Sequence, residues 1–110
     1  MTIVAHMSQL LDILDRLQQL PSERYSPLDK QLLRELLSAT LHNLHELYPD
    51  HLSHYQRYRL ISNLHSLELQ FLAITPGNEV PEHVWPTVQE ALQLTINATL
   101  ANISDAHGKS

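Results

Sequence analysis

The feature that most constrains this fold is the spacing of apolar residues, which recur every three or four positions along almost the whole chain. That period keeps them on one face of an α-helix, whereas a half-buried strand needs alternation with a period of two. No run alternates in that way over the length of a strand. Because only two glycines are present, proline and turn residues are left to end the helices. The sequence therefore predicts an all-α protein.

Prolines and turn residues divide this pattern into predicted helices. The first begins near Ile3 and ends before Pro21, and the second begins at Pro27, after the potential cap Ser26. We expect the second helix to end at Pro49, because proline lacks an N–H group and disfavours helical backbone at the residue before it.

Two further helices are predicted beyond Pro49. Asp50 is expected to cap the third, which ends at the turn sequence of residues 75–78. Residues 79–85 are expected to form a loop or one short helical turn, and the fourth helix begins at Pro86. The apolar rows of the four helices are Ile3, Met7, Leu10, Leu14 and Leu17; Leu33, Leu37, Leu41, Leu44 and Tyr48; Leu60, Leu64, Leu67, Phe71 and Ile74; and Val88, Leu92, Ile96 and Ile103.

Four helices of similar length with short links most simply form an up-and-down antiparallel four-helix bundle. The 110 residues are expected to form a single helical domain, with an ordered core over about residues 2–104 and a short flexible C-terminal tail. The link at Pro49 and Asp50 leaves an alternative open. It can reverse the chain, or it can kink one long helix, which would favour an intertwined dimer.

The composition argues against several classes of function. Seven Lys and Arg against twelve Asp and Glu give a net charge of −5, the wrong sign for binding nucleic-acid phosphates. The sequence has no cysteine, no glycine-rich phosphate loop and no nucleophile elbow. Its longest uncharged run, residues 91–104, is too short to cross a bilayer, and the N-terminus shows no signal peptide. We therefore expect a cytoplasmic protein that is not an enzyme, without catalytic residues, cofactor, nucleic acid or membrane partner.

Four of the eight histidines lie close together, at His42, His45, His51 and His54. Imidazole binds zinc, copper and nickel, and Glu46 is a possible oxygen ligand four residues after His42. No HExxH motif or closed set of four ligands accompanies them, and helical geometry turns the first two histidines away from the apolar row. We interpret them as surface residues and predict no metal site. The alternative is a histidine-rich metal-binding or metal-dependent protein.

Two predicted helices carry more uncharged surface than a small bundle can cover. On the first helix, apolar residues span an arc of about 200°, against the ≳100° that a one-sided surface helix needs. Either Ile13 and Leu20 or else Val4 and Leu11 would be left exposed. The outer face of the fourth helix carries no charge. The predicted partner interface is Val4, Leu11, Ile13, Leu20, Gln93, Asn97 and Ala101.

These features together predict a small helical protein–protein interaction module, a regulator or adaptor without catalytic activity. Its protein partner is not identified by the sequence. We further expect a homodimer formed by the first helix together with the uncharged face of the fourth, because one short chain cannot cover both flanks of the first helix.

Overall fold

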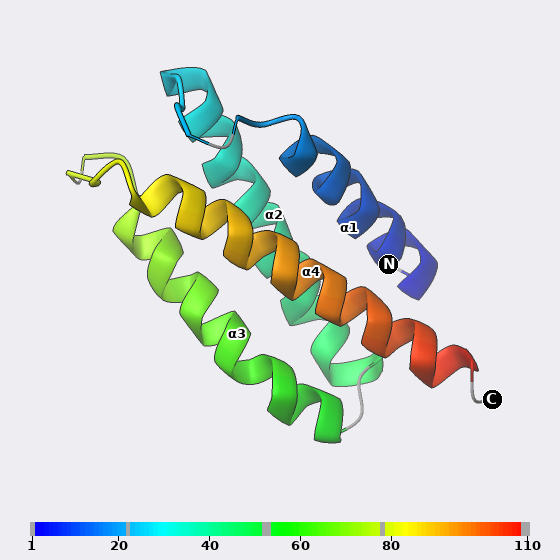
Figure 1. The fold of residues 1–110 in the computed structure, drawn as a ribbon. Helices are drawn as coiled ribbons and strands as arrows, with labels where there is room; N and C mark the ends of the chain where they lie inside the picture. The colour runs from blue at the N-terminus through cyan, green and yellow to red at the C-terminus, as the bar shows by residue number, and fades with distance from the viewer. Residues whose placement is uncertain (1, 22, 52–53, 78, 109–110) are drawn as a thin grey trace.

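The computed structural model describes residues 2–21, 23–51, 54–77 and 79–108, with side chains described outside 48–61 and 104–108. Figure 1 shows four helices joined by short connections. This confirms the predicted all-α class. The helices are α1 (Ile3–Gln18), α2 (Pro27–His51), α3 (His54–Ala73) and α4 (Val84–Gly108).

The four helices alternate in direction along the chain, so each runs antiparallel to the one before it (Figure 1). Each helix contacts its two neighbours around the bundle, α4 closes the ring against α1, and α2 also contacts α4 across the centre. Over the described residues α1 and α3 make no such contact, which places them at opposite corners. The predicted up-and-down antiparallel bundle is therefore confirmed.

Side-chain caps explain where two of the helices begin. The Thr2 hydroxyl accepts a hydrogen bond from the Ala5 N–H at 3.2 Å and caps α1. At α2 the Asp29 N–H donates to the Ser26 hydroxyl at 3.1 Å, while the Ser26 N–H donates to the Asp29 carboxylate at 2.9 Å. This reciprocal pair is a capping box, and it satisfies N–H groups that the first helical turn leaves unpaired. The predicted cap at Ser26 is confirmed.

The predicted helix end at Pro49 is wrong. Helix α2 continues through Pro49 to His51, so Asp50 lies inside α2 and is not the cap of the third helix. A proline weakens the turn before it by removing one N–H, but the residue preceding it is only disfavoured from helical backbone, not excluded. Helix α3 begins at His54 and runs back along α2 (Figure 1). The two helices form a hairpin and not one long kinked helix.

Helix α4 begins earlier than predicted. It starts at Val84, two residues before Pro86, and ends at Gly108. Proline fits the first turn of a helix because its missing N–H would have no helical acceptor there. Between α3 and α4 the predicted turn is present, and Gly77 adopts φ +100°, a conformation that favours glycine.

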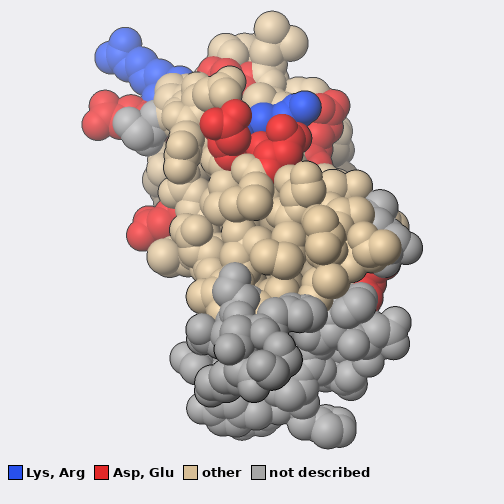
Figure 2. All heavy atoms as spheres, turned by 90° about the vertical axis from the view of Figure 1, so that its right-hand side faces the viewer, with Lys and Arg blue, Asp and Glu red and all other residues tan. Residues whose placement is uncertain are grey.

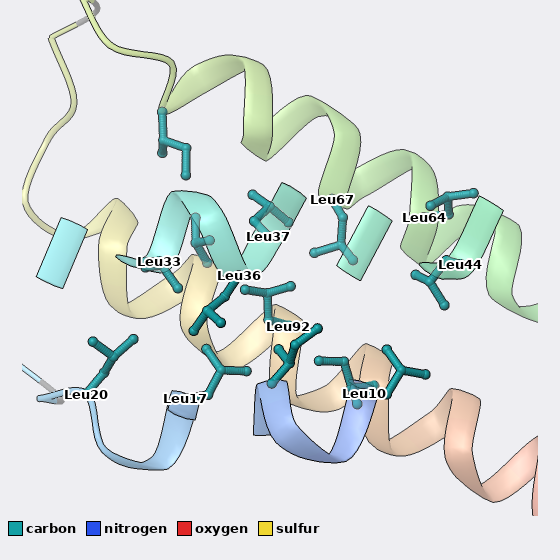
Figure 3. Packing of buried hydrophobic residues seen from close by; sticks show 14 of the residues in the cluster. Leu10, Leu17, Leu20, Leu33, Leu36, Leu37, Leu44, Leu64, Leu67 and Leu92 are labelled. Carbon is teal, nitrogen blue, oxygen red and sulfur yellow. The ribbon is translucent and has the colours of Figure 1, made fainter. Parts of the chain in front are cut away.

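The predicted apolar rows supply most of the core. Leucines from all four helices point toward one another in Figure 3, with Leu17 and Leu10 from α1, Leu37 from α2, Leu67 from α3 and Leu92 from α4. Several row members are only half-buried. Those half-buried members are Ile3, Met7, Leu14, Leu41 and Phe71. The side chains of Tyr48 and Leu60 lie outside the described residues.

Among the helices as described, none is both long and apolar enough to cross a membrane. The cytoplasmic location stays a prediction.

Candidate interaction surface

The two apolar flanks of α1 have opposite environments. Ile13 and Leu20 are buried, at 5% and 8% exposed, while Val4 and Leu11 are 70% and 55% exposed. We predicted that Ile13 and Leu20 belong to the partner interface. The structure corrects this prediction, because both residues lie in the core of the bundle. Helix α2 packs along α1, and its Leu36 lines the same groove as Ile13. Leu20 follows the end of α1 and belongs to the same buried cluster. Val4 and Leu11 remain the exposed apolar residues of α1.

A glutamine fixes how α4 lies along α1. The Gln89 side chain donates from Nε2 to the Leu17 carbonyl at 2.9 Å, and its Oε1 accepts a hydrogen bond from the Tyr25 hydroxyl. Burial raises the pKa of the Tyr25 phenol, and the Asp29 carboxylate raises it further, so the hydroxyl keeps its proton and donates. Gln89 is thus bonded both to the end of α1 and to the segment that follows it.

The contact between Gln89 and Leu17 shows which turns of α4 lie opposite which turns of α1, and so where the other predicted residues of α4 lie along α1. The two helices run antiparallel, so each turn forward along α4 moves one turn back along α1. Asn97 lies about two turns beyond Gln89 and is level with the turn that carries Leu11; Ala101 is level with the turn that carries Val4. Asn97 and Ala101 are exposed and Gln93 is half-buried. We call Val4, Leu11, Gln93, Asn97 and Ala101 the α1–α4 face.

The α1–α4 face carries no charged side chain, and the sequence of α4 from Ala91 to Ser104 has none either. Leu94, also on the outer side of α4, is exposed. Figure 2 views the side where α1 begins and α4 nears its end, and it shows a broad area without Lys, Arg, Asp or Glu beside small groups of charged residues. Surfaces with few charges at their centre are typical of protein interfaces.

A buried histidine that the sequence analysis missed lies at the start of α1. His6 is only 1% exposed, and its Nδ1 lies 2.7 Å from Asn43 Oδ1. The Asn43 amide nitrogen donates to the Ala39 carbonyl at 2.8 Å, so the oxygen faces the ring and Nδ1 carries the proton. The other ring nitrogen, Nε2, lies 3.2 Å from a carboxylate oxygen of Glu46. One residue of α1 is therefore held by two residues of α2.

The signal that could have found His6 is its spacing. It stands four residues before Leu10, in line with Ile13 and Leu17, and all four are buried. The predicted row shared Leu10 and Leu17 but began with Ile3 and Met7, which are half-buried. A polar residue in line with a buried row indicates a hydrogen-bond partner on the facing helix.

The histidine cluster is only partly within the described side chains. His42 and His45 are exposed, as expected, and each lies beside a carboxylate: His42 at 3.0 Å from Glu46 and His45 at 3.2 Å from Glu68. The side chains of His51 and His54 lie outside the described residues. In the part of the chain that is described, no group of three or more His, Asp and Glu side chains is placed to hold a metal ion. The absence of a metal site stays a prediction.

A second group of residues closes the opposite end of the bundle. Trp85 is almost fully buried, and two cations lie over its ring, Lys30 Nζ at 5.5 Å and Arg34 Cζ at 5.1 Å from the ring centre. Lys30 also pairs with Glu82 at 2.8 Å, and Arg34 Nε donates to the Ile74 carbonyl just past the end of α3. Cations over an indole face are stabilising contacts. These residues tie α2 to the connection between α3 and α4.

Comparison with protein-family models, with curated proteins and with solved structures finds no match for this chain. Its function therefore has to be inferred from its own residues.

Proposed function

We propose that this protein is a small helical protein–protein interaction module, a regulator or adaptor without catalytic activity, and that two copies pair through the α1–α4 face. The observation that carries the proposal is the exposure of Val4 and Leu11 beside an α4 whose outer residues are uncharged. Fully burying an apolar side chain of this size contributes about 1.5 to 3 kcal/mol. In a two-fold contact the same residue is buried on both copies, so its contribution to the free energy of association is made twice.

Charge favours a second copy as the partner on this face. Each chain carries a net charge of −5, so two copies repel unless they meet where neither is charged. In a two-fold contact the same patch of each copy meets the other, and residues near the axis meet their own counterparts. The α1–α4 face has no charge to oppose itself. Gln93 and Asn97 carry amides, which both donate and accept hydrogen bonds, so the same side chain from two copies can pair.

The metal-binding alternative has less support from the described residues. His6 and His42 both lie against the Glu46 carboxylate, and His45 lies against Glu68. These contacts engage the side chains that a metal would need as ligands. The interaction module is therefore the proposal that we test first.

Light scattering coupled to size exclusion tests the homodimer. At micromolar concentration the protein should have a mass near twice 12.6 kDa. Leu11→Lys puts two like charges at the proposed contact and should give a monomer that keeps its helical circular dichroism, since Leu11 is already exposed. Ile13→Lys is not a suitable test of the homodimer, because Ile13 is buried and a charge there would disrupt the core.

Leu28→Lys is the matched control, since Leu28 is exposed at the start of α2 and lies outside the α1–α4 face. It makes the same chemical change as Leu11→Lys and should leave the dimer intact. A wild-type mass of one chain would refute the homodimer. A dimer that survives Leu11→Lys, or that is lost equally in both variants, would refute the assignment of this face.

A further inference from the structure

A groove of about 540 Å³ runs between α1 and α2, on the flank of α1 that faces α2. Ile13 from α1 and Leu32, Leu36 and Ala39 from α2 give it an apolar floor. None of these four residues belongs to the α1–α4 face. The groove is therefore distinct from that face, and it needs its own explanation.

The length of the groove indicates the size of its occupant. On α2 its lining extends from Leu32 to Asn43, which at about 1.5 Å per residue is about 16 Å. On α1 it extends from Ser8 to Arg16, about 12 Å. This length matches two to three turns of a helix laid along the groove, and recognition of an amphipathic helix by an apolar groove is a recurring mode of peptide binding.

Carboxylates stand on both helices beside the apolar floor. Asp12 lines the groove from α1 and pairs with Arg16 at 3.1 Å, with both side chains more than half exposed. Glu35 lines it from α2 and accepts a hydrogen bond from the Gln31 amide at 3.3 Å. Over the described residues Glu35 makes no ion pair. Arg16 also lines the groove and compensates Asp12, so Glu35 carries the uncompensated charge of the lining. Charge complementarity therefore favours an occupant with a basic side chain beside an apolar row.

The chain itself does not offer such a segment among its described residues. Lys30 and Arg34 are engaged with Glu82, Trp85 and the carbonyl of residue 74. Arg16 pairs with Asp12, and Arg24 lies between α1 and α2, outside any helix. The α1–α4 face, which suits a second copy, carries no charge. We propose that the groove between α1 and α2 docks an amphipathic helical segment of a different protein, with an apolar row on the floor and Lys or Arg beside Glu35.

The test uses the isotope-labelled full chain and two synthetic helical peptides of about three turns. The peptides share the same row of leucines, flanked by lysines in one and by glutamates in the other. The lysine peptide should shift the backbone amide resonances of Ser8, Gln9 and Ala39 in a saturable way, and the glutamate peptide should bind at least about tenfold more weakly. Added salt should weaken the binding of the lysine peptide, because it screens the charges.

Variants on α2 locate the binding. Ala39 is exposed, so Ala39→Lys should fold normally while it fills the floor and repels the lysine peptide, which abolishes binding. Ser38→Lys is the matched control, because Ser38 is exposed on the same helix but does not line the groove, and it should bind within about twofold of wild type. Glu35→Gln should weaken binding by about threefold, as expected for one exposed charge.

Three outcomes would overturn the proposal. They are equal binding of the two peptides, saturable shifts centred on the α1–α4 face, and no saturable shift up to about 1 mM peptide. Shifts at the groove that depend on the protein's own concentration would show that a second copy occupies it, which also overturns the proposal. The Leu11→Lys variant should bind the lysine peptide as wild type does, so this proposal and the homodimer fail independently.

Discussion

The two ends of the bundle hold their helices together by different chemistry. At the end where α1 begins, the His6 ring lies against the Asn43 side chain at 2.7 Å and a carboxylate of Glu46 at 3.2 Å. At the other end, Trp85 is buried with Lys30 and Arg34 over its ring, and its indole N–H has no partner within the described residues. The first end is held by hydrogen bonds to a buried histidine ring, whereas the second combines hydrogen bonds, such as that from Arg34 Nε to the Ile74 carbonyl, with one large buried ring.

This difference matters because the two kinds of contact fail differently. A directed hydrogen bond that loses one partner leaves the other buried without a bond, so part of the damage is repaired by removing both. A buried ring that is removed leaves a cavity, which only another large side chain can fill. The predictions below use these contrasting responses, beginning with the largest effect.

The largest effect is expected at Trp85. Trp85→Ala should lower the free energy of unfolding by about 3 to 5 kcal/mol, because it empties the space of a fully buried ring. Trp85→Phe should cost only about 1 to 2 kcal/mol, since phenylalanine keeps a ring and the lost indole N–H had no partner among the described residues. Urea denaturation followed by circular dichroism measures both. Equal losses in the two variants would show that the full indole is needed and that a smaller ring does not fill its place.

The next effect is expected at His6. His6→Leu should cost about 1 to 3 kcal/mol, because Asn43 Oδ1 stays buried without its donor. Adding Asn43→Leu removes the stranded acceptor, so the double variant should be more stable than His6→Leu alone. The same denaturation experiment, arranged as a double-mutant cycle, measures the coupling between the two positions. A double variant whose loss equals the sum of the single losses would show that the contact is not specific.

The smallest effect is expected at the exposed histidines near the same end. His42→Ala combined with His45→Ala should shift the melting temperature by less than about 3 °C, because both side chains are exposed and their contacts with Glu46 and Glu68 are screened by water. A loss close to that of His6→Leu would show that the cluster contributes to the fold. Metal analysis of the purified protein completes this test, and one tightly held ion per chain would support the metal-binding alternative.

Local features of the sequence were enough to predict the fold class, both ends of α1, the start of α2 and the end of α3. The apolar period of three to four residues predicted the helices, Ser26 and Asp29 form the capping box of α2, and the turn before Gly77 ends α3. These signals depend on neighbours within a few residues, which the sequence displays directly. Pro49 was misjudged because proline disfavours a helix without excluding one, and the outcome depends on how the surrounding turns pack.

The tertiary structure decided which residues of the predicted faces are covered. The sequence showed that α1 has two apolar flanks, but only the packed bundle shows that Ile13 and Leu20 are buried while Val4 and Leu11 are exposed. It likewise showed a histidine at position 6, whose partner Asn43 lies 37 residues away along the chain. A periodic pattern determines the face that a helix presents, whereas burial depends on which distant segment packs against that face, and that is settled only when all four helices pack together.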